Sequence, residues 1–409
     1  MSIHETKPDP FISPPYADCP ECSAREAFGV LMVNRRNYVR RCHQCRHMKT
    51  IPLPAVDRRL VYLDQLALSN LAKARGDTAP KTNEEHFWRA VLDQLSRLVR
   101  LQLVSCPLST FHEEEGLVWS GYEALRAIGR LLSAELEFHD YTVIRNGQLY
   151  EHAQLWEQGR GDEAPSLDVD RVIEGDRQAW QPRLLIDARL PIPEDLVDEL
   201  NRMRAAEDEG LTSVWTRWAA EDMSFDDRFQ EEARSYGRVL LELIAARAAM
   251  MAGILPTATH RFRNNSAAVT FLIVQRALEA AGVPRERVAE RAAKYLGSDS
   301  LVNVPFNRIS SLLYAALARR ARAGQKGVSR GMTNDVRMLS TLLPYCDAVF
   351  VDRECHALLT EKPISERIGY GTQFFSYQNK EAFVTYLEET ERSTRREHLA
   401  LVEEVYGPI

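Results

Sequence analysis

Two short apolar runs, each followed at once by an aspartate, constrain the fold of this 409-residue chain more than any other feature. The first run covers residues 60–63 (LVYL) and is followed by Asp64, and the second covers residues 348–351 (AVFV) and is followed by Asp352. Continuous apolar runs of this length are typical of parallel strands that are covered on both faces. Because ligands of open α/β sheets bind just beyond the carboxyl ends of the strands, we expect both aspartates to lie at one such edge.

Two further acids belong to neighbouring elements of the same pattern. Asp335 opens a predicted helix whose apolar residues recur at helical spacing until Pro344 ends it. Glu115 lies early in another predicted helix, which follows a strand at 101–104 and has Ser109 as its N-cap. The remaining elements of the alternation are two helices and a last strand, at residues 66–74, 84–100 and 372–376. Such alternation predicts an α/β fold with a parallel sheet.

Taken singly, each of these acids has an ordinary structural explanation. Asp64, Asp335 and Asp352 are each suited to cap a helix, and Glu115 is one of three adjacent glutamates that solvent could surround. Their joint placement favours a common site instead. Carboxylates that converge without a cation repel one another and raise one another's pKa, and Mg²⁺, which prefers oxygen ligands, removes that conflict. The pattern therefore predicts a divalent-metal site.

Four of the seven cysteines form two pairs near the amino terminus. Cys19 and Cys22 are followed, after 19 intervening residues, by Cys42 and Cys45. This spacing is typical of a structural Zn²⁺ site with four thiolate ligands, and the alternative is a redox or fortuitous set of cysteines. The three other cysteines lie in apolar or strand settings and are interpreted as core residues: Cys106, Cys346 and Cys355.

Basic residues gather in two stretches, although the net charge of −6 argues against a uniformly basic nucleic-acid binder. Near the cysteines, the candidates for contact with a phosphate backbone are Arg35, Arg36, Arg40 and Arg41, with Tyr38 as a stacking surface. Between residues 300 and 334, which contain no acid, the candidates are Arg319, Arg322, Lys326 and Arg330. The structural alternatives are a solvated face for the first stretch and a favourable helix end for the second.

Three segments together resemble the PIN-domain nuclease superfamily. They are VYLDQ (61–65), PLSTFHEEE (107–115) and TNDVRMLSTLLPYCDAVFVDRE (333–354), the last similar to a PYCDAxFxD segment of large bacterial PIN-like proteins. The resemblance implies a Rossmann-like sheet and an acid cluster that binds Mg²⁺ or Mn²⁺ and cuts nucleic acid, usually RNA. Its acids fall on Asp64, Glu115, Asp335 and Asp352. Glu115 rather than its two neighbours is chosen because it lies six residues after Ser109, and Asn334 adds a polar contact.

The resemblance covers residues 58–118 and 305–390 and departs from compact members of the superfamily in two ways. A gap of 219 residues separates Glu115 from Asp335, and the cysteine-rich segment precedes the core. The predicted domains therefore begin with an irregular lead-in over 1–18 and a zinc ribbon over 19–50. A PIN-like core follows in two parts, 58–118 and 305–409, and the second part includes C-terminal helices. A mainly helical insertion over 119–304 separates the two parts. Within the insertion, helices are predicted near 193–207 and 228–252.

The resemblance implies a metal-dependent nuclease, and because members of the superfamily usually cut RNA, it implies an endoribonuclease. A role as a toxin or phage-defence effector that a protein partner keeps inactive stays open. The alternative is a catalytically inactive binding module that is recruited through its ribbon. The amino terminus lacks a signal-peptide core, and no apolar stretch is long enough to span a bilayer, so we expect a cytoplasmic protein. Self-association through the insertion also stays open.

Overall fold

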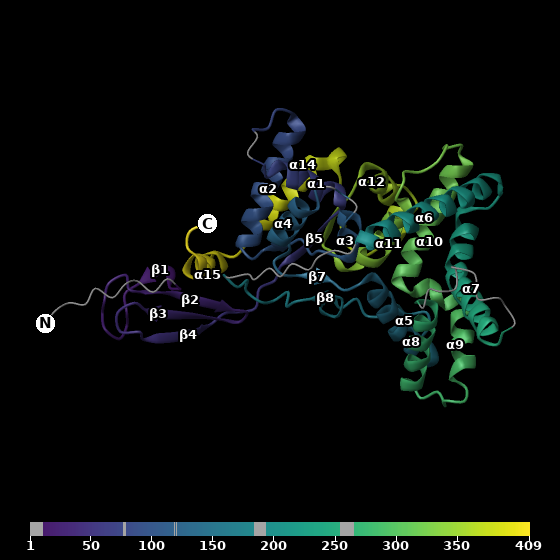
Figure 1. The fold of residues 1–409 in the computed structure, drawn as a ribbon, viewed down its shortest axis with the longest axis horizontal. Helices are drawn as coiled ribbons and strands as arrows, with labels where there is room; N and C mark the ends of the chain where they lie inside the picture. Colours follow the sequence, from purple (N-terminus) through teal and green to yellow (C-terminus); the bar gives the residue numbers. More distant parts are fainter. Residues whose placement is uncertain (1–10, 77–78, 118, 120, 184–193, 254–265) are drawn as a thin grey trace.

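The computed structural model describes residues 11–76, 79–117, 119, 121–183, 194–253 and 266–409. It is a mixed α/β structure in which a cysteine-rich antiparallel sheet lies at one end, a parallel sheet with its helices in the middle, and a group of long helices at the other end (Figure 1). Among the described helices, none combines the length and the apolar character needed to cross a membrane.

The amino-terminal sheet contains four antiparallel strands in sequence order, β1 (Ser13–Ala17), β2 (Phe28–Asn34), β3 (Asn37–Cys42) and β4 (Met48–Pro52). The prediction of an irregular lead-in over 1–18 is wrong for Ser13–Ala17, because this segment pairs with β2. Residues 1–10 lie outside the described part of the chain. The four cysteines come from the turn between β1 and β2, the end of β3 and the turn that follows it.

The central sheet contains four parallel strands in the order β10–β9–β5–β6. Their bounds are β5 (Arg59–Leu63), β6 (Val104–Ser105), β9 (Ala348–Phe350) and β10 (Gln373–Phe375). The two runs that end in aspartate are neighbours in register, with Val61 opposite Ala348 and Leu63 opposite Phe350. The strand predicted at 101–104 begins later, because Leu101 is the C-cap of the preceding helix.

Strand β5 is buried on both faces, as its continuous apolar run predicts. Leu60 and Tyr62 belong to one buried cluster, and Val61 and Leu63 belong to another. Helices that pack on the Val61 face are α1 (Gln65–Ala74), α2 (Asn83–Arg100), α4 (Tyr122–Ser133), α14 (Lys380–Arg392) and α15 (Arg396–Tyr406). Helices that contribute to the Leu60 cluster include α3 (Thr110–Leu117), α10 (Pro305–Arg322), α11 (Met332–Leu342), α12 (Arg353–Thr360) and α13 (Ile364–Arg367).

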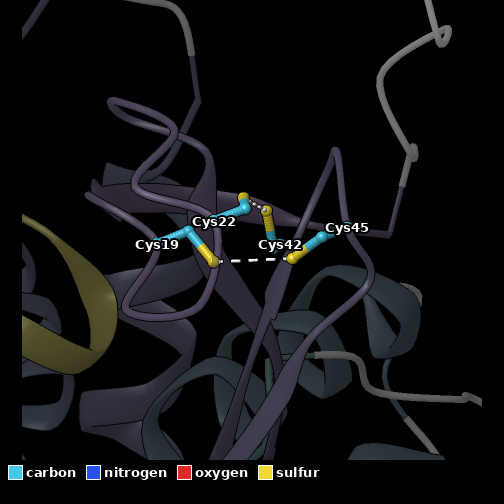
Figure 2. Close-up of side chains that lie close together, drawn as sticks. All are labelled: Cys19, Cys22, Cys42 and Cys45. Carbon is cyan, nitrogen blue, oxygen red and sulfur yellow. Dashed lines mark hydrogen bonds between the residues drawn. The ribbon is translucent and has the colours of Figure 1, made fainter.

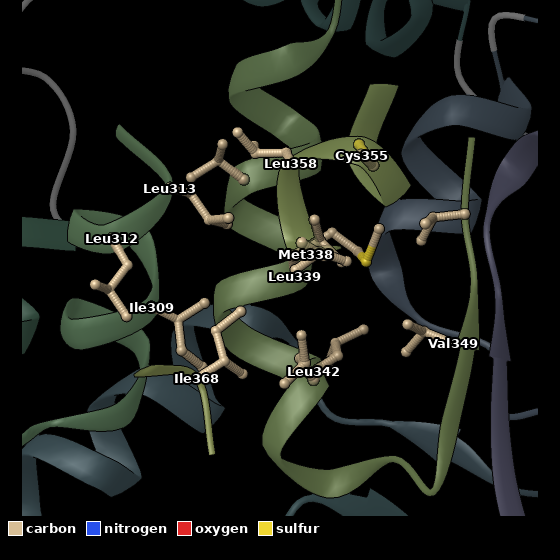
Figure 3. Packing of buried hydrophobic residues seen from close by; sticks show 14 of the residues in the cluster. Ile309, Leu312, Leu313, Met338, Leu339, Leu342, Val349, Cys355, Leu358 and Ile368 are labelled. Carbon is tan, nitrogen blue, oxygen red and sulfur yellow. The ribbon is translucent and has the colours of Figure 1, made fainter. Parts of the chain in front are cut away.

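Helix α11 lies between α10 and strand β9, and this packing fixes its position beside the sheet. Figure 3 shows Leu313 of α10 and Leu339 of α11 in the shared cluster, with Val349 of β9 beyond them. Leu313 and Leu339 have no solvent exposure, and Val349 has 1%. Helix α11 ends at Leu342 and is followed by a 3-10 turn that contains Pro344, which agrees with the predicted helix end.

The insertion contains the long helices α6 (Glu194–Ala220) and α7 (Phe225–Met251), together with α5 (Tyr141–Glu157), α8 (Ser266–Ala280) and α9 (Val288–Leu296) (Figure 1). A two-stranded sheet, β7 (Glu137–Phe138) with β8 (Ile173–Glu174), precedes α6. Helix α6 extends well beyond the predicted end at 207. Short 3-10 turns occupy Val169–Arg171, Asp299–Asn303, Leu343–Tyr345 and Tyr377–Asn379.

The amino-terminal sheet is docked on the C-terminal helix α15, and this contact uses two residues that the sequence analysis assigned to nucleic acid. Tyr38 has no solvent exposure, and its hydroxyl donates to the carboxylate of Glu404. The Arg40 guanidinium is 6% exposed and donates to the backbone oxygens of Phe28 at 3.2 Å and Glu404 at 3.0 Å. The interpretation of Tyr38 as a stacking surface and of Arg40 as a phosphate contact is therefore wrong, because both side chains are internal.

Candidate functional site

A pocket of about 530 Å³ lies at the carboxyl edge of the parallel sheet, and all four predicted acids line it. Asp64 follows β5, Glu115 belongs to α3, Asp335 belongs to α11, and Asp352 follows β9. Parallel neighbouring strands end at the same edge, which brings Asp64 and Asp352 together, and the packing of α3 and α11 beside β5 and β9 adds the other two. The convergence expected from the positions of these acids is present in the structure.

Two of the acids also serve as helix caps. The Asp64 Oδ1 atom accepts a hydrogen bond from the amide of Ala67 at 2.8 Å and caps α1. The Asp352 Oδ1 atom accepts one from the amide of Cys355 at 2.7 Å and caps α12. The ordinary structural explanation is thus correct for both aspartates. It does not exclude a role in the pocket, because each of these caps uses Oδ1 and leaves Oδ2 outside that contact.

The other two acids are placed by helices rather than by strand ends. Helix α11 begins at Met332, so Asp335 lies in its first turn instead of opening it. Glu115 accepts a hydrogen bond on Oε1 from the Asn334 side-chain amide at 2.6 Å, which links α3 to α11 across the pocket. Glu113 lines a different pocket, so the choice of Glu115 from the three adjacent glutamates agrees with the geometry.

The electrostatics of the pocket oppose full ionisation of its acids. Burial raises the pKa of Asp64 to about 8, and the carboxylates of Asp352 and Glu115 add to the rise, while the Ala67 amide opposes it. Burial, followed by Glu115, Asp352 and Asp64, raises the pKa of Asp335 well above its ordinary range. Burial also raises the pKa of Glu115. A bound cation would relieve the repulsion, since it favours the charged form of every carboxylate beside it.

Asp335, Asp352 and Cys355 place one potential ligand atom each within 4.8 Å of one another. The carboxylate oxygens fit Mg²⁺ or Mn²⁺, which take oxygen ligands. Cys355 is 2% exposed, in agreement with its interpretation as a core residue, but its position beside the acids was not predicted. Burial, and then the charges of Asp335 and Asp352, raise the pKa of the Cys355 thiol well above its ordinary value, so it stays protonated in the absence of a cation.

His112 is a packed histidine that holds α3 against β5. Its Nε2 atom donates to the backbone oxygen of Leu63 at 2.7 Å, and its Nδ1 atom accepts from the amide of Ser109 at 3.2 Å. The ring is stacked on Tyr62 with centroids 4.8 Å apart. Burial lowers the pKa of His112 to about 4, which keeps the ring neutral at pH 7. His112 therefore fixes the helix that carries Glu115 one turn later.

Helix α6 of the insertion contributes three pocket residues that the sequence analysis missed, Arg204, Glu207 and Asp208. Their spacing of i, i+3 and i+4 places them on one face of the helix. No motif marks them, and only the helical period of the segment indicates that they share a face. Trp119 also lines the pocket.

The four amino-terminal cysteines form a compact cluster (Figure 2). The Sγ atoms of Cys19 and Cys45 are 3.6 Å apart, and those of Cys22 and Cys42 are 3.7 Å apart. A tetrahedral Zn²⁺ site with Zn–S bonds of about 2.3 Å has S–S edges of about 3.8 Å. The cluster could therefore hold a metal ion such as zinc. His43 and His47 are not part of it.

The remaining predicted nucleic-acid contacts differ in how much free charge they offer. Arg319 is paired with Glu361 at 2.8 Å, and Arg322 is paired with Asp222, so much of their charge is neutralised within the protein. Arg36 forms an exposed pair with Asp176 at 3.3 Å, Arg35 is exposed, and Arg41 is half-buried. Lys326 and Arg330 are both exposed on the loop before α11, and Arg330 lines the acidic pocket.

Comparison of the chain with models of known protein families, with curated proteins and with solved structures gave no match.

Proposed function

We propose that this protein is a metal-dependent nuclease that hydrolyses phosphodiester bonds, with RNA as the first candidate substrate. One observation carries the proposal: four carboxylates from four separate segments line one pocket, and the pKa of three of them is raised. Carboxylates gathered in this way suit a divalent ion whose remaining ligands are water and phosphate oxygens. The preference for nucleic acid, and for RNA, comes from the resemblance to PIN-domain nucleases.

In this proposal Asp335 and Asp352 hold Mg²⁺ or Mn²⁺, with Asp64 and Glu115 as further ligands either directly or through water. The ion, when bound, lowers the pKa of water and neutralises charge on a phosphate. The chain's own contribution is positioning. The Asn334 side-chain amide orients Glu115, the caps of α1 and α12 fix Asp64 and Asp352, and the packing of α11 fixes Asp335.

The cysteine cluster is proposed to hold one structural Zn²⁺. All four thiols contribute, so no ligand position is left for water, which is the arrangement of structural rather than catalytic zinc sites. Its role is to stabilise the cysteine-bearing end of the amino-terminal sheet, since the separate buried cluster at that end contains, besides Cys19 and Cys42, only Ala27 and Phe28.

The proposal is tested by incubating the purified zinc-loaded protein with labelled RNA and with single-stranded DNA, in buffers containing Mg²⁺, Mn²⁺ or no divalent ion. We expect cleavage that requires the added ion. Glu115→Gln should abolish it, and the adjacent Glu113→Gln, which lies outside the acidic pocket, should leave it within about twofold. Ion-independent cleavage, or full activity of Glu115→Gln, would contradict the assignment of the acids. Failure of the wild-type protein to cleave either nucleic acid would contradict the nuclease proposal itself.

A further inference from the structure

Helix α6 is anchored near its carboxyl end and lines the acidic pocket with turns from the middle of the helix. Leu211, Trp215 and Trp218 are buried in the cluster shared with α10 and α11, and Trp215 Nε1 donates to the backbone oxygen of Gln325 at 3.2 Å. The turn that precedes these anchors carries Arg204, a pocket residue about 21 Å from Trp218 along the axis at 1.5 Å per residue. The insertion therefore supplies part of the pocket wall.

The pocket-facing turn of α6 is attached to α11 by two polar contacts. Glu207 forms an ion pair with Arg337, and the Asp208 carboxylate accepts a hydrogen bond from the amide of Gly331 at 3.1 Å. Gly331 is the N-cap of α11 and has a φ of +88°, a left-handed conformation that suits glycine. Because α11 also carries Asp335, these contacts hold Arg204 in a fixed position relative to the acids.

Arg204 has a donor that no protein group in the described structure satisfies. Its Nη2 atom is buried and has no hydrogen-bond partner among the described residues. Its charge acts on Glu114 and Glu115, where it opposes the rise in pKa, yet the described residues include no carboxylate within 4 Å of its guanidinium. A buried donor without a partner is costly. Because Nη2 has almost no solvent-accessible surface, an acceptor that arrives with a ligand reaches it when the guanidinium turns towards the pocket that Arg204 lines.

The chemistry of the pocket identifies that ligand as a phosphate. A phosphodiester carries a negative charge and would enter a pocket lined by Asp64, Glu115, Asp335 and Asp352, so it needs cationic contacts beyond those used to balance the acids. A guanidinium offers parallel N–H donors that match two phosphate oxygens, and it stays charged at any physiological pH. Arg204 provides this group inside the pocket, whereas Arg330 and Lys326 are exposed outside or at its rim.

We propose that Arg204 binds a phosphate of the substrate, and that the helical insertion thereby completes a site whose acids come from the α/β core. The inference rests on the proposed function for its choice of substrate. The competing role for Arg204 is that of an internal counter-ion for Glu114 and Glu115, which would stabilise the metal-free protein and would require no ligand.

The experiment measures binding rather than cleavage, so its failure is separable from failure of the nuclease proposal. Asp64→Asn, loaded with zinc and supplied with Mg²⁺, is titrated into a short fluorescein-labelled oligouridylate while anisotropy is recorded. The additional variants are Arg204→Ala, Arg204→Lys and, as the matched control, Arg202→Ala. Arg202 lies on the same helix in an exposed pair with Glu199 at 2.9 Å, so its removal takes away the same charge from outside the pocket.

We expect Arg204→Ala to weaken binding about tenfold or more, Arg204→Lys to weaken it less, and Arg202→Ala to change it by less than about twofold. The slope of log affinity against log salt should fall by about 0.7 for Arg204→Ala, the value for one phosphate contact with a single strand. Equal affinities for Arg204→Ala and its parent, equal losses for Arg202→Ala and Arg204→Ala, or no binding by the parent would each overturn the inference.

Two further measurements separate ligand binding from an internal counter-ion. Circular dichroism and Mn²⁺ titration of each variant should show an unchanged fold and an unchanged or tighter affinity for the ion. If Arg204→Ala fails to fold, Arg204→Lys, which keeps the charge but loses the planar fork, provides the comparison. If the loss of oligonucleotide affinity in each variant is fully accounted for by the loss of folded protein, Arg204 is an internal counter-ion and the inference is overturned.

Discussion

Replacement of Asp64 by asparagine should make the metal-free protein more stable at neutral pH while weakening its response to Mg²⁺. Asparagine is as good an N-cap as aspartate, so the hydrogen bond to the Ala67 amide that begins α1 is retained. The change therefore removes mainly the negative charge. In the absence of a divalent ion that charge is unfavourable, because the pocket buries it beside Asp352 and Glu115.

The size of the effect follows from the pKa of Asp64, which rises from an ordinary value of 3.8 to about 8 in the folded protein. The folded-state pKa is the higher one, so protonation favours folding. The associated stability is fully present below about pH 4 and is lost as the pH rises towards about 8. At 1.36 kcal/mol per pKa unit, about three units between pH 4 and pH 7 correspond to a loss of about 4 kcal/mol. Asp64→Asn should recover a stability gain of this order at pH 7.

The assay is urea unfolding of the two proteins at pH 5, 7 and 8, followed by circular dichroism. The buffers should be freed of Mg²⁺ by a resin pretreatment rather than by EDTA, which would also remove zinc from the cysteine cluster. Addition of Mg²⁺ at 100 times its dissociation constant for the wild-type protein should stabilise that protein by about 2.7 kcal/mol and should stabilise Asp64→Asn less, because Asp335 and Asp352 remain to hold the ion. Parallel pH profiles for the two proteins, or equal stabilisation by Mg²⁺, would refute the reasoning.

Three further changes test other parts of the structure. Cys42→Ser should lower the zinc content from one ion per chain to none and, because the amino-terminal sheet packs on α15, should increase hydrogen exchange in both segments; retained zinc would contradict the site. Gly237→Ala should destabilise the protein by about 3 kcal/mol, since its Cβ would lie 1.9 Å from the backbone oxygen of the last residue of α9. The control Gly210→Ala, whose Cβ meets open space, should be neutral or stabilising by about 0.5 kcal/mol. Thermal unfolding measures both changes. Lys326→Ala should weaken nucleic-acid binding about two- to threefold, more than Arg322→Ala, whose charge is already paired; the reverse order in anisotropy titrations would contradict this reading of the basic loop.

The parts of the site that the sequence could indicate are those set by local rules. An apolar run followed by an acid places that acid at a strand end whatever surrounds it, and this placement is found for Asp64 and Asp352. Helical spacing and Pro344 gave the extent of α11 to within a few residues, which was enough to place Asp335 beside Asp64 and Asp352. The cysteine cluster could likewise be predicted, because its four members lie within a short segment of the chain.

The parts that the sequence could not indicate depend on contacts between distant segments. Arg40 and Tyr38 have the composition of an exposed basic face, but α15, more than 350 residues later, covers them. Arg319 is one of a run of basic residues without a nearby acid in sequence, and its partner Glu361 comes from the end of α12. Arg204 belongs to no motif, and its place in the pocket follows only from how α6 packs on the rest of the molecule.

The separation of the four acids along the chain has a consequence for how the protein is made. Asp64 and Glu115 leave the ribosome early, while Asp335 and Asp352 follow only after 219 intervening residues that include the whole insertion. A chain whose synthesis has not passed the insertion, or one that a protease has cut in the insertion and from which one part has been lost, carries at most half of the carboxylates. If the pocket cleaves nucleic acid, the growing polypeptide is harmless to the ribosome that synthesises it, and activity begins only when the last third of the chain has folded against the first.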